Sequence, residues 1–269
     1  MRVGVLIIGS LLWDNDPIRI GWRESRLSLD DRQQIRAPIG YRKRSETWHC
    51  AFTMTFRPDA ALGKAILVPC RNQAGDANAV LQEAQELWQS EHRSQTVGPI
   101  AATWGCVGAA FRSAVSPDVT EWSHRFRRKV ASPVAPVDGQ GILAIPWPTR
   151  TEDDKPADCD VILATATKPS PTIPDARVVA EAWLEQSGGA EKYFFENIRC
   201  GIRTPEDIDI WEHIASSSPT WLTDVCYAEA IATLQKEVAL ASNKRVEPPA
   251  LNLCGQVRAF FRRGSRADR

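Results

Sequence analysis

The sequence predicts a protein that mixes α-helices and β-strands, and three segments carry this prediction. Residues 3–8 form a short, mostly β-branched run that ends at a Gly-Ser turn, which is typical of a buried strand. Apolar and smaller or polar side chains alternate in residues 48–56, which is the period-two pattern of a half-buried strand. Asp76 can cap a helix that continues to about His92.

The remaining elements follow from the same signals. Further strands are predicted at residues 63–68, 103–111, 141–147 and 160–166. Further helices are predicted at residues 119–130, 178–185, 190–200 and 223–242. Another helix should begin at Thr204-Pro205-Glu206-Asp207, because a hydroxyl cap, a proline in the first turn and acidic residues at the positive end of the dipole favour a helix start.

The chain is expected to form one domain over residues 1–242, followed by an Arg-rich tail over 243–269. Residues 112–158 are rich in Pro, Ser, Asp and Arg, so they are interpreted as an insertion that leaves the core. The basic run Arg42-Lys43-Arg44 follows an expected Gly-Tyr turn. It could draw an acidic substrate toward a pocket, or it could be an ordinary charged loop.

Composition excludes several classes of function. The 33 basic and 33 acidic residues give no net charge, which argues against non-specific nucleic-acid binding. The seven cysteines form no CxxC pair and the four histidines show no metal-ligand spacing, so we expect reduced thiols and no metal site. No apolar run reaches the length of a membrane span. We expect a cytoplasmic protein, and the sequence does not indicate its oligomeric state.

The turn Gly9-Ser10, directly after the first strand, is the first candidate for chemistry. Glycine lets the backbone bend so that consecutive N–H groups can converge on an anion, and the serine hydroxyl adds a donor. The turn lacks the GxxxxGK and GxGxxG motifs of nucleotide-binding loops. The alternative is an ordinary connection between a strand and a loop.

The second candidate is Glu91. On a helical wheel Ala84, Leu87 and Trp88 share one arc with Val80, and Glu91 lies near the middle of that arc. A carboxylate on the core-facing side must be paired or hydrogen-bonded, and such a group can move protons near neutral pH. The alternative is that Glu91, near the helix end, turns into water.

Three stretches of the chain resemble the γ-glutamylcyclotransferase-like superfamily, which includes the ChaC-type glutathione-degrading enzymes and the γ-glutamylamine cyclotransferases. They are GSLLWD after the first strand, LWQSE around Glu91, and EKYFFENIRCG at residues 191–201. The resemblance covers about half of the chain. The aromatic residue that this family has just before the glycine is Ile8 here.

The resemblance implies an α+β fold, with a β-barrel-like core flanked by helices, and a reaction that needs no metal or organic cofactor. It also implies that Glu91 transfers the proton. The γ-glutamyl head of a small-molecule substrate would be held by Ile8, Gly9, Ser10, Leu11, Leu12 and Tyr193.

The expected function is therefore a cyclotransferase that releases 5-oxoproline from a γ-glutamyl peptide or amine. The α-amine of the substrate would attack its own γ-carbonyl, so no nucleophilic side chain is required. A hydrolase is disfavoured because Ser10 lies in no GxSxG motif. A non-catalytic protein that binds a small ligand in the same pocket is the main alternative, and an adaptor that uses its arginine clusters is a third.

Overall fold

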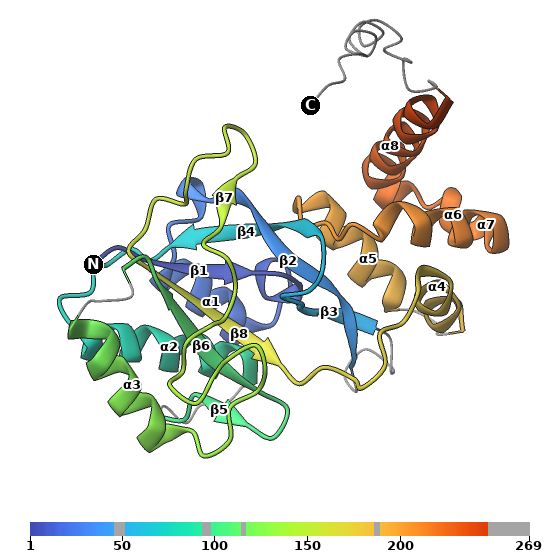
Figure 1. Cartoon of the computed structure of the whole chain (residues 1–269). Helices are drawn as coiled ribbons and strands as arrows, with labels where there is room; N and C mark the ends of the chain where they lie inside the picture. Colours follow the sequence, from blue (N-terminus) through green and yellow to red (C-terminus); the bar gives the residue numbers. More distant parts are fainter. Residues whose placement is uncertain (46–51, 93–97, 114–116, 186–188, 247–269) are drawn as a thin grey trace, which may run out of the picture.

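The computed structural model describes residues 1–45, 52–92, 98–113, 117–185 and 189–246 (Figure 1). Its centre is a single mixed sheet with the strand order β3-β2-β4-β1-β8-β6-β5, and β7 pairs with β2 outside this path. The strands are β1 (Val3–Ile7), β2 (Gln33–Arg44), β3 (Phe52–Phe56), β4 (Leu62–Pro69), β5 (Ala101–Ala102), β6 (Gly105–Phe111), β7 (Thr149–Arg150) and β8 (Val161–Thr167).

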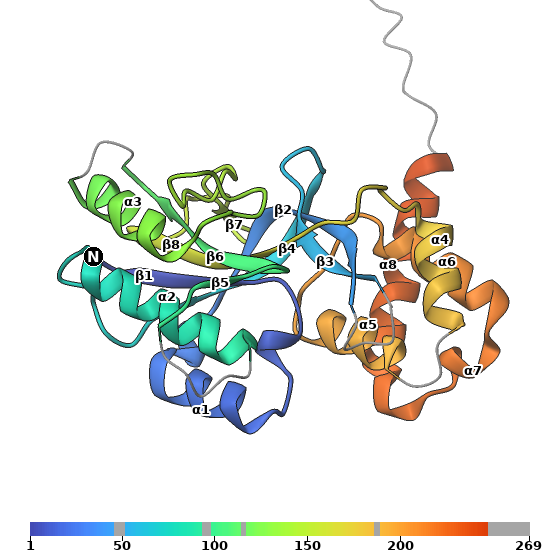
Figure 2. The same cartoon turned by 90° about the horizontal axis from the view of Figure 1, so that it is seen from below.

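Helices surround this sheet on several sides. They are α1 (Pro17–Arg26), α2 (Ala77–His92), α3 (Pro117–Lys129), α4 (Ala176–Leu184), α5 (Ala190–Arg199), α6 (Asp207–Ser217), α7 (Pro219–Leu222) and α8 (Ala228–Val246). Figure 2 shows α1 and α2 against one face of the sheet, while α4 to α8 gather beyond its β3 side. Among the described helices, none combines the length and apolar character that a bilayer crossing requires.

Strand β1 lies in the middle of the sheet, and the turn that follows it forms part of the candidate site. It runs parallel to β8 and antiparallel to β4, and all five of its residues are buried. Burial on both faces explains why the segment is a continuous apolar run rather than an alternating one. The strand ends at Ile7, so the Gly-Ser turn lies at the edge of the core.

The sheet curls without closing into a barrel of paired strands. Its hydrogen-bonded path through the described residues is open, running from β3 to β5. The hydroxyl of Thr55 on β3 nevertheless donates to the main-chain oxygen of Thr167 on β8, at 3.3 Å. The mixed α and β class is thus confirmed, and the expected barrel is present only as a curl in which β3 approaches β8.

Most predicted elements occur within a few residues of their expected positions. The strands at residues 3–8, 63–68, 103–111 and 160–166 correspond to β1, β4, β6 and β8, and the helices at 76–92, 119–130, 178–185 and 190–200 correspond to α2 to α5. For the strand at 48–56, residues 52–56 form β3, and the rest lies outside the described residues. The final helix begins at Ala228 rather than at residue 223, because a 3₁₀ turn, η3 (Val225–Tyr227), precedes it.

The predicted strand at residues 141–147 is wrong. Only Ile142 and Leu143 make isolated bridges, to Ala109 and Val137. Gly141 has a φ of +80°, and a Cβ there would come within 2.3 Å of Phe126, so the chain turns sharply under α3 at this point.

The predicted Gly-Tyr turn before Arg42 is also wrong, because Gly40 and Tyr41 lie inside β2. Ile35, Ala37, Ile39 and Tyr41 share one face of the strand and are buried, and residues 37–41 are buried without a break, so the middle of β2 is covered on both faces. Pro38, in the middle of this run, hides the pattern from a sequence-based assignment because proline is unusual inside a paired strand.

Residues 112–158 contribute to the core rather than leaving it. Trp122 and Phe126 of α3 are almost fully buried, and Val134, Val137 and Leu143 join the same cluster. At the other end of the chain, α8 continues to Val246, so the first four residues of the expected tail are helical. Residues 247–269 lie outside the described part.

Buried Asp207 joins the helices beyond β3 to the sheet. Its carboxylate accepts hydrogen bonds from Tyr41 Oη at 2.9 Å, from the amide and hydroxyl of Thr204 at 3.0 and 2.7 Å, and from Arg203 Nε at 3.1 Å. Burial raises the pKa of Asp207, while Arg203 and Thr204 act in the opposite direction. Thr204 thus donates hydrogen bonds to the side chain of Asp207, the first residue of α6. The sequence predicts the reverse, a Thr204 cap that accepts a hydrogen bond from a helix amide.

We expect Asp207→Ala to lower the free energy of unfolding by about 3 kcal/mol, because several buried donors lose their acceptor and the nearly buried guanidinium of Arg203 keeps only its ion pair with Glu237. Asp209→Ala, at an exposed position of the same helix turn, is the matched control and should change it by less than about 0.5 kcal/mol. Urea denaturation measures both. Equal midpoints for the two variants would show that the Asp207 network does not hold the helices to the sheet.

Candidate functional site

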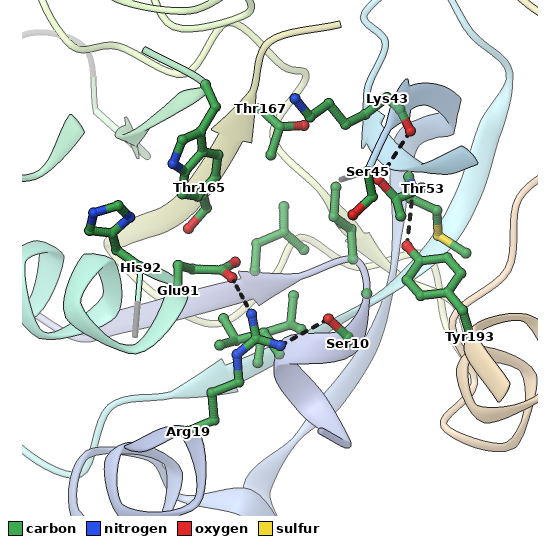
Figure 3. Close-up of a pocket in the computed structure, with 17 residues that line it drawn as sticks. Ser10, Arg19, Lys43, Ser45, Thr53, Glu91, His92, Thr165, Thr167 and Tyr193 are labelled. Carbon is green, nitrogen blue, oxygen red and sulfur yellow. Dashed lines mark hydrogen bonds and ion pairs between the residues drawn. The ribbon is translucent and has the colours of Figure 1, made fainter. Parts of the chain in front are cut away.

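A cavity of about 380 Å³ opens where β1 ends (Figure 3). Its lining comes from segments far apart in the chain: the turn after β1, helix α1, strands β2, β3 and β8, the end of α2, the turn before β6, and α5. The curl of β3 toward β8 leaves this space between the strand ends. The cavity contains polar and charged groups as well as apolar walls.

Six of the seven residues expected to form a pocket line this cavity. They are Ile8, Gly9, Ser10, Leu11, Glu91 and Tyr193. Leu12 is the exception, since it packs against the core from the same turn. The first hydrogen bond of the 3₁₀ turn η1 (Ser10–Leu12) runs from the Leu12 amide to the Gly9 oxygen. The amides of Ser10 and Leu11 therefore take no part in the turn's own hydrogen bonds.

Helix α5 packs against this turn. A Cβ at Gly9 would lie 3.0 Å from Tyr193 Oη, so a larger residue there would crowd the tyrosine hydroxyl. Tyr193 Oη accepts a hydrogen bond from the amide of Met54 at 3.1 Å, and burial raises the pKa of Tyr193, which keeps the phenol neutral. Trp13 adds an edge contact with the Tyr193 ring and donates to Asn197 Oδ1 at 2.8 Å.

Arg19 connects the turn to Glu91. Its Nη1 donates to Ser10 Oγ at 3.0 Å and to Asp14 Oδ2 at 2.9 Å, and its Nη2 pairs with Glu91 Oε2 at 3.1 Å. We call these four residues the Arg19 junction. The side chains of Arg19, Asp14 and Glu91 are 8%, 16% and 19% exposed. Glu91 is thus held in an ion pair at the cavity wall rather than turned into water.

Helix α1, which the sequence analysis missed, places Arg19 in this position. Asp16 caps the helix by accepting from the amide of Ile18 at 2.9 Å, and Pro17 occupies its first position. Arg23, one turn after Arg19, donates to the main-chain oxygens of Leu11 and Asp14, both at 2.8 Å. The Asp-Pro pair was a helix start signal in the sequence that could have revealed this element.

A second contact fixes α1 against α2. Arg26, in the last turn of α1, forms an ion pair with buried Glu83 of α2. Arg19 and Arg26 thus attach the same helix to α2 at two places, with Glu91 and Glu83 as the acceptors. The position of Glu91 relative to the turn is set by this double attachment.

The opposite part of the cavity is aromatic and basic. Trp104 stacks on Trp88 with ring centroids 4.8 Å apart, and His92 stacks on the same ring at 6.0 Å. Trp104 and His92 both line the cavity, as does Lys43 from β2. None of these three residues was assigned to a pocket from sequence. The basic run that contains Lys43 is expected only, as one of two alternatives, to attract an acidic substrate.

Among the described residues, no group of three or more His, Cys, Asp or Glu side chains could hold a metal ion. Burial raises the pKa of several thiols, including that of Cys106, so these cysteines remain protonated within the core. Comparisons of the chain with protein-family models, with curated proteins and with solved structures found no match.

We expect Arg19→Met to lower the free energy of unfolding by about 3 kcal/mol, because two partly buried carboxylates lose the cation between them. Arg36→Met is the control: Arg36 pairs with Asp154 at the surface, so its loss should cost less than about 0.5 kcal/mol. Both values come from urea denaturation. Wild-type stability of Arg19→Met would contradict a stabilising role for the junction.

Proposed function

We propose that this protein is a cyclotransferase that releases 5-oxoproline from a γ-glutamyl compound. This is the reaction of the γ-glutamylcyclotransferase-like enzymes that its three sequence stretches resemble. One observation carries the proposal: the Glu91 carboxylate and the Gly9–Leu11 turn line the same cavity, although some 80 residues separate them in the chain. Arg19 lies between the two and contacts both.

The charges of the Arg19 junction suit a γ-glutamyl head. Glu91 lines the cavity, and its carboxylate can attract the α-ammonium group of such a head. The amides of Ser10 and Leu11 are donors for the α-carboxylate or for the oxyanion that develops at the γ-carbonyl. The substrate head would therefore lie along the turn with its nitrogen toward Glu91.

The reaction then follows from proton transfer. Glu91 removes a proton from the α-ammonium group, and the free amine attacks the γ-carbonyl carbon to form the new C–N bond of the lactam. The bond between that carbon and the leaving nitrogen breaks, and Glu91 returns the proton to this nitrogen. The ring nitrogen gives up its second hydrogen as a proton, which the released amine takes up, so the products are 5-oxoproline and the leaving amine in its ammonium form. Because the attack is intramolecular, holding the substrate in a folded conformation supplies much of the acceleration.

The Arg19–Glu91 ion pair also fits one alternative to the cyclotransferase, a non-catalytic protein that binds a ligand. In a non-catalytic binding protein, Glu91 would serve only to hold Arg19 against the turn, and the cavity would retain its ligand unchanged. Both functions use the same residues in the same place, so a measurement of turnover is needed to separate them.

We expect Glu91→Gln to lower the rate of 5-oxoproline release at least about 100-fold, since the amide cannot take up the substrate proton. The variant should bind γ-glutamyl compounds and keep its fold. Glu86→Gln is the matched control, because Glu86 is a half-buried glutamate of the same helix that does not line the cavity, and it should retain full activity.

The assay uses purified protein and a panel of γ-glutamyl peptides and amines, with 5-oxoproline quantified by chromatography. Equal rates for Glu91→Gln and the unchanged protein would exclude Glu91 as the proton carrier. Binding of a γ-glutamyl compound without any release of 5-oxoproline would favour the binding protein over the cyclotransferase.

A further inference from the structure

The part of the cavity opposite the Gly9–Leu11 turn has features that the proposed reaction leaves unused. Five residues define this region, which we call the outer subsite: Lys43, His92, Trp104, Thr165 and Thr167. They come from β2, α2, the turn before β6, and β8. A role for the outer subsite rests on the proposed function, because this region would hold the leaving group of the same substrate.

Lys43 brings a positive charge to this region. It is half-buried on β2 and lines the cavity, and none of the acidic side chains in the described ranges forms an ion pair with it. In Figure 3 its ammonium group points toward Thr167, on the far side of the cavity from Ser10. A half-buried cation facing an enclosed space is a natural partner for an anionic group of a ligand.

Two hydroxyl groups beside Lys43 have unused hydrogen-bonding capacity. The Oγ1 atoms of Thr165 and Thr167 are buried and have no hydrogen-bond partner in the described part of the protein. The two residues alternate along β8, so their side chains share the face that lines the cavity. Thr165 itself is only 9% exposed. Because buried polar groups are nearly always paired, these hydroxyls indicate a ligand that supplies polar atoms here.

The aromatic wall lies next to Glu91. His92 and Trp104 both stack on Trp88, with interplanar angles of 20° and 19°. Their own ring centroids lie 6.2 Å apart and their planes are tilted by 31°, so together they form a bent two-ring platform. His92 directly follows Glu91 in the chain, which places the platform beside the carboxylate that returns a proton to the leaving nitrogen. A planar apolar group attached to that nitrogen would stack on these rings.

We infer that the outer subsite binds an aromatic amino acid as the leaving group, so that the preferred substrates are γ-glutamyl conjugates of aromatic amino acids. The platform of His92 and Trp104 stacks on the ring. Lys43 and the hydroxyls of Thr165 and Thr167 bind the carboxylate. A neutral amine would leave Lys43 and both hydroxyls unpaired, and a small amino acid would leave the platform uncovered.

The test compares three compounds that differ by one group at a time. They are γ-glutamyl-phenylalanine, γ-glutamyl-alanine, which lacks the ring, and γ-glutamyl-phenethylamine, which lacks the carboxylate. Rates of 5-oxoproline release give kcat/KM for each. We expect kcat/KM for the phenylalanine conjugate to exceed that of the alanine conjugate about tenfold, because of stacking, and that of the phenethylamine conjugate about fivefold, because of the charge pair.

Three variants of the outer subsite and two controls assign these preferences to residues. Trp104→Ala should abolish the advantage of the ring, so that kcat/KM for the phenylalanine conjugate falls to about that for the alanine conjugate, and Trp104→Phe should restore most of the advantage. Lys43→Met should abolish the advantage of the carboxylate. Trp147→Ala and Lys64→Met, half-buried residues outside the cavity, are controls that should alter neither preference.

Equal kcat/KM for the three compounds, or an equal loss on all of them in Trp104→Ala, would overturn the inference. In that case 5-oxoproline would still form, and the proposed function would stand. If none of the compounds is cyclised, the function fails, and calorimetric binding of γ-glutamyl-phenylalanine decides the subsite. Binding weakened in Trp104→Ala and in Lys43→Met would support the subsite, and absent binding would overturn it.

Discussion

The site depends on one guanidinium group. Arg19 contacts the Ser10 hydroxyl, Asp14 and Glu91, which belong to the turn after the first strand, the loop before α1 and the end of α2. A guanidinium that is only 8% exposed is costly to bury unless its donors are matched, so its acceptors are constrained in turn. This side chain joins the turn after β1 to the end of α2. The ion pair of Arg26 with Glu83 attaches the same two helices, α1 and α2, a second time, so the orientation of Glu91 toward the turn is defined by both contacts.

The cavity has opposite charge at its two ends. Glu91 contributes a carboxylate to one part of the lining, whereas Lys43 brings a positive charge to the outer subsite. A ligand that matches this pattern carries a cation at one end and an anion at the other. The γ-glutamyl conjugate of an amino acid has this form when its α-ammonium group lies at Glu91 and its distal carboxylate at Lys43. The proposed chemistry and the inferred leaving group therefore draw on one electrostatic arrangement.

Short sequence patterns predicted the helices and strands that depend mainly on neighbouring residues. The first strand, the helix that carries Glu91 and the late helix with its terminal glycine all occur close to their expected positions. Arg19 was missed because α1 was not recognised, despite its Asp-Pro start signal. Lys43 was placed before a strand instead of within one, because Pro38 and Gly40 obscure the alternation of β2. The outer subsite depends on long-range strand pairing that brings Trp104 near β8, which no short stretch of sequence encodes.

A crystal structure of Glu91→Gln with γ-glutamyl-alanine bound tests the central claim most directly, because this variant should retain its ligand without turning it over. We expect the γ-glutamyl head to lie along the Gly9–Leu11 turn, with the α-nitrogen about 3 Å from the side-chain oxygen at position 91. Arg19 should remain between them. A head bound outside the cavity, or reversed so that its α-carboxylate lies at position 91, would contradict the proposed mechanism.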